Sequence, residues 1–266
     1  MSTDHSKPLS SFLAGFAMIS LWRFLTMDAI NSRFRRSFLG LGWLVINALA
    51  FALGAGFLWA SIFQIEPGEF VPYIGLGFAI WGFVAAMLVE GCDIVFASSA
   101  YTKQLPIPYS VFIVRSVMVQ SFYFAVAFVA TIFASIALGL ELTWNALWAL
   151  PGIAIMLWIG LSVAIILSFV GARFRDLSHG ISSLLQLLFV LTPIIYPASI
   201  LETRGFAWVT QFNPIASLLD LIRVPIIEGR LADAYDYIFL GAVGVVLSVL
   251  AFLSVTTLAK RTIFWL

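Results

Sequence analysis

The stretch RFRRSFLGLGW, residues 33–43, places three arginines directly before an apolar segment that continues to residue 63. Within 38–63 the polar side chains are Asn47 and Ser61. The segment is long enough to cross a hydrocarbon core of about 30 Å, because a helix rises about 1.5 Å per residue. Lys and Arg beside a span are retained on the cytoplasmic side. The stretch therefore predicts a transmembrane helix that begins at the cytoplasmic face.

The composition of the 266-residue chain predicts an integral membrane protein. Hydrophobic residues make up 62% and charged residues 10%, and the mean hydropathy is +1.06, which lies far outside the range of soluble domains. Apolar runs predict an all-α fold with six transmembrane helices, at residues 38–63, 70–89, 109–140, 144–171, 181–197 and 237–259.

Two further segments predict membrane contact without a full span. Residues 9–36 mix apolar and charged side chains, which favours an amphipathic helix that lies in the cytoplasmic interface against membrane lipids. The alternative for 9–36 is a disordered tail followed by a short first span. The apolar pieces 206–212 and 214–222 are each too short to cross, and predict a re-entrant helical pair between spans five and six. We therefore divide the chain into a tail and interfacial helix, 1–36, and a transmembrane domain, 37–262.

The distribution of charge predicts the orientation of the spans. Eleven of the 14 Lys and Arg residues fall on the predicted cytoplasmic side, and the other three are Arg204, Arg223 and Arg230. Eight of the 13 acidic residues fall on the outer side. Because orientation responds mainly to Lys and Arg near span ends, both termini are predicted to be cytoplasmic.

The sequence contains no motif that supplies enzymatic chemistry. None of its lysines stands in a glycine-rich phosphate-binding loop, and His5 and His179 lack the spacing of a zinc protease. The single cysteine, Cys92, forms neither an internal disulfide nor a metal cage. We therefore expect no catalytic residue, no metal site and no nucleic-acid partner.

A charged segment follows the second predicted span. Residues 90–108 predict a short amphipathic helix that prolines end. Glu90 and Asp93 lie three residues apart on one face of it, a spacing that would also suit a proton relay or a metal site. We expect instead that both face Arg115 at the interface, because an unpaired arginine at membrane depth is costly.

A second charged segment, at Arg173, Arg175 and Asp176, leaves two interpretations open. It is either a loop that only sets orientation, or a docking or gating surface at the cytoplasmic mouth.

Aromatic residues are abundant, with 25 Phe, 9 Trp and 7 Tyr. Those near the outer face favour an interfacial belt. The alternative is a path for sugars, because flat aromatic faces contact polyols without demanding one hydrogen-bond pattern. The candidates for that path are Phe51, Phe57, Trp59, Phe189 and Tyr196.

Several stretches, in a consistent order from about residue 10 to the end, resemble the permease subunit of type-2 ABC exporters for polysaccharides, the O-antigen, capsule and teichoic acid export family. The stretches are 33–43, TKQLPIP at 102–108, RFRDL at 173–177, LTPIIYP at 191–197, and FNP at 212–214 with Arg223 and Gly229. The chain departs from the family where Leu41 and Ala48 stand at positions that often carry proline.

The resemblance implies a homodimer in the inner membrane, with each copy joined to a separate ATPase subunit that binds ATP and Mg. This chain would then hold no cofactor. The coupling helix on the ATPase would comprise Ala97, Tyr101, Thr102, Lys103, Gln104 and Leu105. A lipid-pyrophosphate-linked glycan would pass outward through the dimer. Basic residues at the inner mouth, Arg33, Arg35 and Arg36, would attract its pyrophosphate.

Two alternatives stay open. One is a type-2 ABC exporter of a drug or small lipid, which a narrow, dry interface would favour. The other is a secondary transporter or channel that needs no ATPase.

Overall fold

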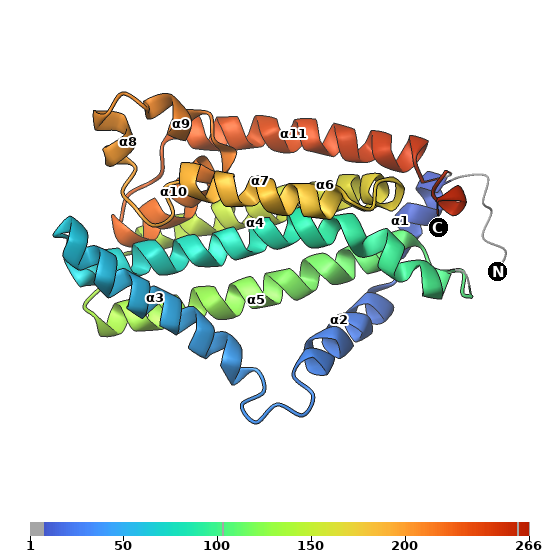
Figure 1. The fold of residues 1–266 in the computed structure, drawn as a ribbon, viewed down its shortest axis with the longest axis horizontal. Helices are drawn as coiled ribbons and strands as arrows, with labels where there is room; N and C mark the ends of the chain where they lie inside the picture. The colour runs from blue at the N-terminus through green and yellow to red at the C-terminus, as the bar shows by residue number, and fades with distance from the viewer. Residues whose placement is uncertain (1–7, 103, 260, 266) are drawn as a thin grey trace.

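The computed structural model describes residues 8–102, 104–259 and 261–265, which form helices joined by turns and short loops, without a β-strand (Figure 1). The elements in chain order are α1 (Pro8–Ala17), α2 (Ile19–Arg33), α3 (Gly42–Phe63), α4 (Pro67–Thr102), α5 (Tyr109–Ala137), η1 (Trp144–Trp148), α6 (Ala149–Arg173), α7 (Leu177–Leu191), α8 (Ser199–Thr203), α9 (Ala207–Gln211), α10 (Pro214–Ile227), α11 (Ala234–Thr257) and η2 (Thr262–Phe264).

Helix α4 is the centre of the bundle. It packs against α3, α5, α6, α7 and α10, and its side chains Ile74, Ile80 and Met87 are almost completely buried. Helices α5, α6 and α11 extend along the same long axis (Figure 1). The apolar side chains of α4 are therefore covered by protein, rather than by lipid, on most sides of the helix.

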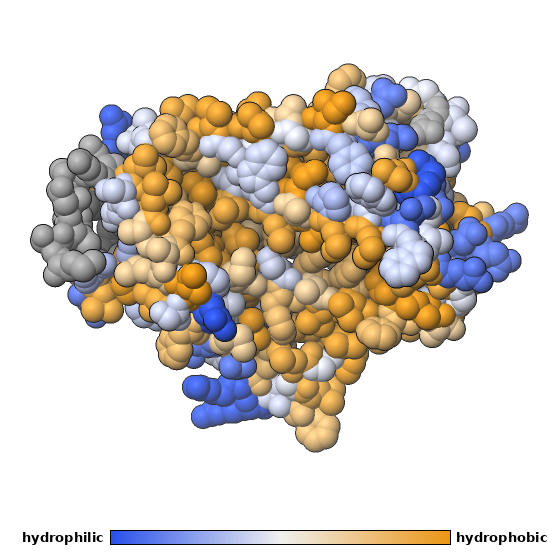
Figure 2. Space-filling view, turned by 180° about the vertical axis from the view of Figure 1, so that it is seen from behind, coloured by the Kyte–Doolittle hydropathy of each residue, from blue (hydrophilic) through white to orange (hydrophobic). Residues whose placement is uncertain are grey.

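The outer surface of the bundle is apolar. Figure 2 shows hydrophobic residues over much of the middle of one face, and hydrophilic residues gathered at its ends and on the corner that projects below. On α11, Val245, Val246 and Val249 are each more than half exposed. Apolar surface of this extent is stable when hydrocarbon covers it. The predicted all-α membrane fold is confirmed.

The described residues include five helices long and apolar enough to cross a membrane: α3, α4, α5, the continuous stretch Trp144–Arg173, and α11. The pair α1 and α2, bent by 70°, meets the same criteria jointly. The predicted fifth span corresponds to α7, which is apolar but has 15 residues, about 22 Å of helix. Helix α7 ends at Leu191, six residues before the predicted end at 197, because the residue before a proline is disfavoured in a helix and Thr192 precedes Pro193.

The amphipathic segment predicted at 9–36 forms two helices rather than one. Both pack against α5. The buried hydroxyl of Ser110 on α5 donates to the carbonyl of Phe12 on α1 at 2.5 Å. Helix α1 is therefore fastened to the beginning of α5, while α2 continues along α5 toward the α2–α3 loop. That these helices lie in the membrane interface stays a prediction.

The separate short helix predicted at 90–108 is wrong. Helix α4 continues without a break to Thr102. Gly91, Cys92 and Val95 are buried, and Gly91 lies against Ala164 and Leu167 of α6. The charged residues Glu90 and Asp93 suggested an interface helix, but the residues beside them continue the buried face of α4.

The segment between the predicted fifth and sixth spans consists of short helices, as predicted. Asn213 ends the first apolar piece and caps α10, because its Oδ1 accepts a hydrogen bond from the amide of Ile215 at 3.0 Å. Pro214 then occupies the first turn, where a missing N–H costs nothing. Helix α10 is buried along most of its length and packs against α4, α6 and α11. Re-entry into a membrane stays a prediction.

Candidate translocation path and docking surfaces

Two of the predicted path residues are joined by an aromatic row that crosses three helices. The ring of Phe51 on α3 lies 4.7 Å from that of Phe78 on α4. Phe78 in turn lies 5.8 Å from Phe189 on α7, and Phe189 lies 5.4 Å from Trp81. These separations are typical of favourable ring pairs. The row Phe51–Phe78–Phe189–Trp81 therefore forms a connected aromatic face on α3, α4 and α7.

A second row connects Trp59 with the turn that contains Tyr196. Trp59 stacks on Phe63 at 5.5 Å, and Phe63 meets Phe70 at 5.7 Å. Phe70 stacks on Tyr73 at 5.4 Å, and the Tyr73 hydroxyl donates to the carbonyl of Tyr196 at 3.0 Å. The remaining candidate, Phe57, is 43% exposed and belongs to neither row in the described part of the chain.

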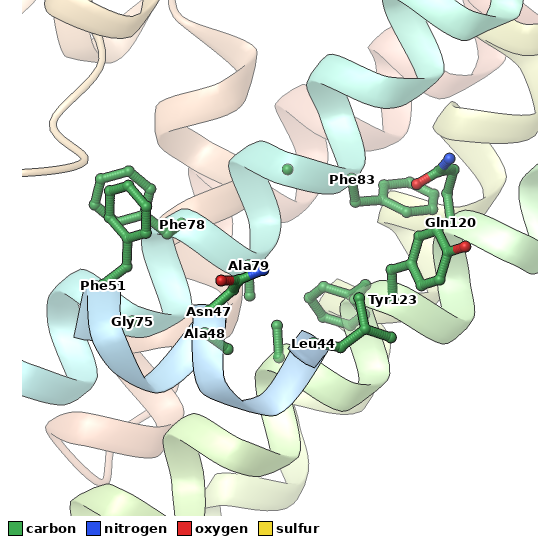
Figure 3. Close-up of a pocket in the computed structure, with 13 residues that line it drawn as sticks. Leu44, Asn47, Ala48, Phe51, Gly75, Phe78, Ala79, Phe83, Gln120 and Tyr123 are labelled. Carbon is green, nitrogen blue, oxygen red and sulfur yellow. The ribbon is translucent and has the colours of Figure 1, made fainter. Parts of the chain in front are cut away.

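A cavity of about 290 Å³ lies between α3, α4 and α5, beside the first aromatic row. Figure 3 shows the rings of Phe51 and Phe78 side by side at one end of it, and Tyr123 near Gln120 at the other. The Asn47 side chain extends between them (Figure 3). The lining thus combines ring faces with amide and hydroxyl groups, a combination that suits ligands with both apolar and hydroxyl surface.

The polar end of this cavity is connected to the predicted inner mouth. The buried amide of Gln120 donates to Glu90 Oε2 at 2.6 Å. The guanidinium of Arg33, at the end of α2, lies 5.0 Å from the centre of the Tyr123 ring. Arg35 and Arg36 follow in the exposed α2–α3 loop. The cationic loop thus stands beside the cavity, at the projecting corner between α2 and α3 (Figure 1).

The predicted pairing of Arg115 with Glu90 and Asp93 is wrong. Arg115 Nε donates to the carbonyl of Leu25 on α2 at 3.3 Å, whereas Glu90 accepts from Gln120. Among the described residues, no ion pair joins Arg115 to either carboxylate. The sequence could not show that α2 would pack on α5 and supply a carbonyl to this arginine.

The second basic group contacts other elements. The Arg173 guanidinium lies 5.3 Å from the ring of Trp265 near the C-terminus. The Arg175 guanidinium lies 4.5 Å from the ring of Phe96 on α4. Asp176 is exposed at the beginning of α7. The residues of this group therefore lie around the ends of α4 and α6, apart from the α2–α3 loop, and their role beyond orientation stays a prediction.

The predicted coupling segment lies at the turn between α4 and α5. Ala97, Tyr101 and Thr102 belong to the last turns of α4, and Gln104 and Leu105 form the following turn, while Lys103 lies outside the described residues. Tyr101 and Leu105 are 57% and 52% exposed. The turn lies at the same end of the molecule as α1 and the C-terminus (Figure 1). Its exposed apolar side chains suit contact with another protein.

Sequence reasoning missed the α4 residues that connect the aromatic rows. Phe78 and Trp81 lie three residues apart, a spacing that predicts a shared side of α4, whereas Tyr73 precedes Phe78 by five residues and gives no such signal. Sequence reasoning also counted Arg223 only as one of three basic residues on the outer side and did not predict its burial, whereas Arg223 is 2% exposed. A charged residue inside an apolar helix at 214–227 was the available signal.

Comparisons with known proteins identify the family of the chain. The family described as ABC-2 type transporter matches residues 20–227. An O-antigen export system permease protein RfbA from Klebsiella pneumoniae is 26% identical over 227 residues, which cover 85% of this chain and 86% of that protein. A protein of the same name from Myxococcus xanthus is 26% identical over 224 residues, covering 84% of this chain and 86% of its own length. The chain therefore belongs to the membrane subunits of the ABC-2 type transporter family.

Proposed function

We propose that this chain is the transmembrane subunit of an ATP-driven exporter that moves a lipid-linked polysaccharide, of O-antigen or capsule type, out of the cytoplasm. The observation that carries the proposal is the aromatic row Phe51–Phe78–Phe189–Trp81, which offers ring faces from three helices. Sugars stack on such faces without a fixed pattern of hydrogen bonds. The names of the similar permeases support the same substrate class.

The energy source in this proposal is a separate subunit. Membership of the ABC-2 family implies an ATP-binding partner, and favours an ABC exporter over a secondary transporter or channel. The partner binds ATP and Mg and hydrolyses ATP. The exposed turn that contains Tyr101 and Leu105 offers it a contact surface. Closure of the partner subunits would push on this turn, and because α4 is continuous to Thr102, the push would reach the bundle centre directly.

The assembly in this proposal is a homodimer in the inner membrane with both termini in the cytoplasm. Helices α3 and α7 bear large exposed apolar side chains beside the aromatic rows, including Leu58, Leu184 and Leu187. Two copies that meet near these helices would place their aromatic rows around one path. Tilting of α3 and α7 would then open the path between the protomers.

The α2–α3 loop supplies the electrostatic part of the mechanism. Arg33, Arg35 and Arg36 raise the local concentration of an anionic head group at the inner mouth, because like charges gathered at a low-dielectric boundary focus the field. The adjacent cavity, with Gln120 and Tyr123 at its polar end, lies next to that point.

The test is export by proteoliposomes that contain this chain together with its ATP-binding subunit. The double variant Arg35→Glu, Arg36→Glu should lower ATP-dependent accumulation of glycan in the lumen, whereas Arg261→Glu, at another exposed position, should not. Protease access to a C-terminal tag checks insertion, because these arginines also orient the first span. Unchanged export by the inserted double variant would remove the two arginines from the mechanism. Absence of ATP-dependent export by the wild-type complex would refute the proposed function.

A further inference from the structure

Arg223 on α10 is a buried arginine held by backbone carbonyls. Its Nη1 donates to the carbonyl of Pro193 at 2.8 Å, and its Nη2 donates to the carbonyl of Ile194 at 3.0 Å. No carboxylate oxygen lies within 4.0 Å of its guanidinium nitrogens in the described ranges, and Asp220, three residues earlier on α10, acts on it electrostatically from further away. A buried guanidinium is costly unless its partners are well placed. The partners here are two consecutive carbonyls at the point where α7 breaks, and the planar fork of arginine can bind both at once.

Helix α4 is shaped to receive this guanidinium. The Tyr73 ring lies 3.8 Å from Arg223 Cζ, in the geometry of a cation–π contact. One turn further along α4, a Cβ at Gly77 would overlap Nη2 of Arg223. The Tyr73 hydroxyl also lies 3.0 Å from the carbonyl of Pro193, which Arg223 shares, and 3.0 Å from that of Tyr196. Gly77 therefore leaves the space that the guanidinium of Arg223 occupies, and Tyr73 contacts both this guanidinium and the segment that follows α7.

A second contact joins α10 to the same break. The side-chain amide of Asn213, which caps α10, donates to Thr192 Oγ1 at 2.9 Å. Thr192 is completely buried and donates in turn to the carbonyl of Leu188 on α7. The segment 192–194 is thus fastened to α10 by Asn213 and by Arg223. Predicted path residues stand on either side of it, with Phe189 before and Tyr196 after.

The arrangement retains one unpaired buried donor. Among the residues that the structure describes, Arg223 Nε has no hydrogen-bond partner, and an unsatisfied buried donor is unfavourable. An uncharged side chain in α10 would avoid this cost if helix packing alone were needed. The charge is explained if the outer end of α7 must be held in a defined position against α10.

We propose that Arg223 is a positioning residue for export: it locks α10 to the broken end of α7, so that the two move as one body and carry Phe189 and Tyr196 with them. The proposal rests on the proposed function, since it assigns these aromatic side chains to the path. Without the lock, the last turn of α7 is free to leave α10, and the path loses its outer aromatic residues although the bundle remains assembled.

The first experiment measures export and ATP hydrolysis by the complex that carries Arg223→Met. Export should fall about tenfold or more, since two charge-assisted hydrogen bonds are lost, while ATP hydrolysis should stay within about twofold because α10 lies away from the α4–α5 turn. Arg223→Lys keeps the charge but lacks the fork, and should be intermediate. Arg230→Met is the matched control, because Arg230 is exposed and bonds Glu228 in the neighbouring loop. Wild-type export by Arg223→Met would overturn the proposal.

The second experiment measures the lock directly and needs no substrate. Spin labels at Val190 and Phe212, which are 65% and 70% exposed, report the distance between the end of α7 and the beginning of α10, in chains diluted with unlabelled copies. The distance distribution should be narrow with Arg223 and broad with Arg223→Met. Tyr73→Phe removes only a hydroxyl and should broaden the distance distribution to a smaller extent. This variant replaces Arg223→Met in the experiment if Arg223→Met does not fold. An unchanged distribution in the variants would overturn the lock, whereas a wild-type complex without export would refute only the proposed function.

Discussion

The substitution Gly171→Ala should separate α4 from α6. Gly171 lies in the last turns of α6 and is buried against Cys92 of α4. A Cβ at this position would overlap the carbonyl oxygen of Cys92 and would stand 2.7 Å from both its carbonyl carbon and its Cα. These are backbone atoms in the middle of a continuous helix. They cannot turn aside as a side chain would, so the two helices must move apart.

The expected cost follows from this overlap. Adding a methyl group to a tightly packed contact destabilises by about 1–3 kcal/mol. For a chain of this size each kcal/mol corresponds to about 2–4 °C in Tm, so the Tm should fall by roughly 2–12 °C. Gly241 on α11 provides the matched control, because a Cβ there meets nothing within 4 Å. Gly241→Ala should leave the Tm unchanged or raise it, since alanine is the better helix former by about 1 kcal/mol.

The assay is thermal unfolding of the purified protein in detergent, followed by tryptophan fluorescence from its 9 Trp residues. Several heating rates should be compared, because irreversible unfolding makes the apparent Tm depend on the rate. A Tm for Gly171→Ala that equals or exceeds that of Gly241→Ala would refute the reasoning. It would mean that α4 and α6 are not in backbone contact at this point.

Three further predictions concern the path, the cavity and the orientation. Phe189→Ala should lower export by up to about tenfold, since a ring contact contributes about 0.5–1.5 kcal/mol and 1.4 kcal/mol is a factor of ten. The control is Leu150→Ala, because Leu150 is exposed. An equal loss of export in both variants would contradict the assignment of Phe189 to the path. Gln120→Leu should lower the free energy of unfolding by only about 1 kcal/mol, because Glu90 is exposed and regains water; calorimetry that shows a much larger loss would contradict this. A reporter enzyme inserted at Pro67 should be found on the outer side of the membrane. A reporter at this position that is found in the cytoplasm would overturn the predicted orientation.

The sequence by itself located most of the long apolar helices and gave their order, although the predicted fifth span is the short helix α7. Residues 38–63 and 237–259 were identified as spans, and α3 and α11 cover most of both. The reason is that the transfer of a segment into hydrocarbon depends on its own side chains and its own length, so the signal is local. The end of α7 at Leu191 and the cap at Asn213 depend on equally local signals, because proline and asparagine act on the adjacent backbone.

Only the tertiary structure decided which side chains meet. Glu90 suggested a helix at the interface, but α4 continues because packing against α6 covers its next turns. Arg115 donates a hydrogen bond to a carbonyl on α2 rather than pairing with a carboxylate on α4. The Tyr73 hydroxyl meets the Pro193 carbonyl 120 residues away, and Arg223 meets the same atom from α10. Such contacts depend on how each helix is rotated about its axis and how deeply it lies in the bundle. Hydropathy and charge constrain the length and direction of a helix, but they specify neither its rotation nor its depth.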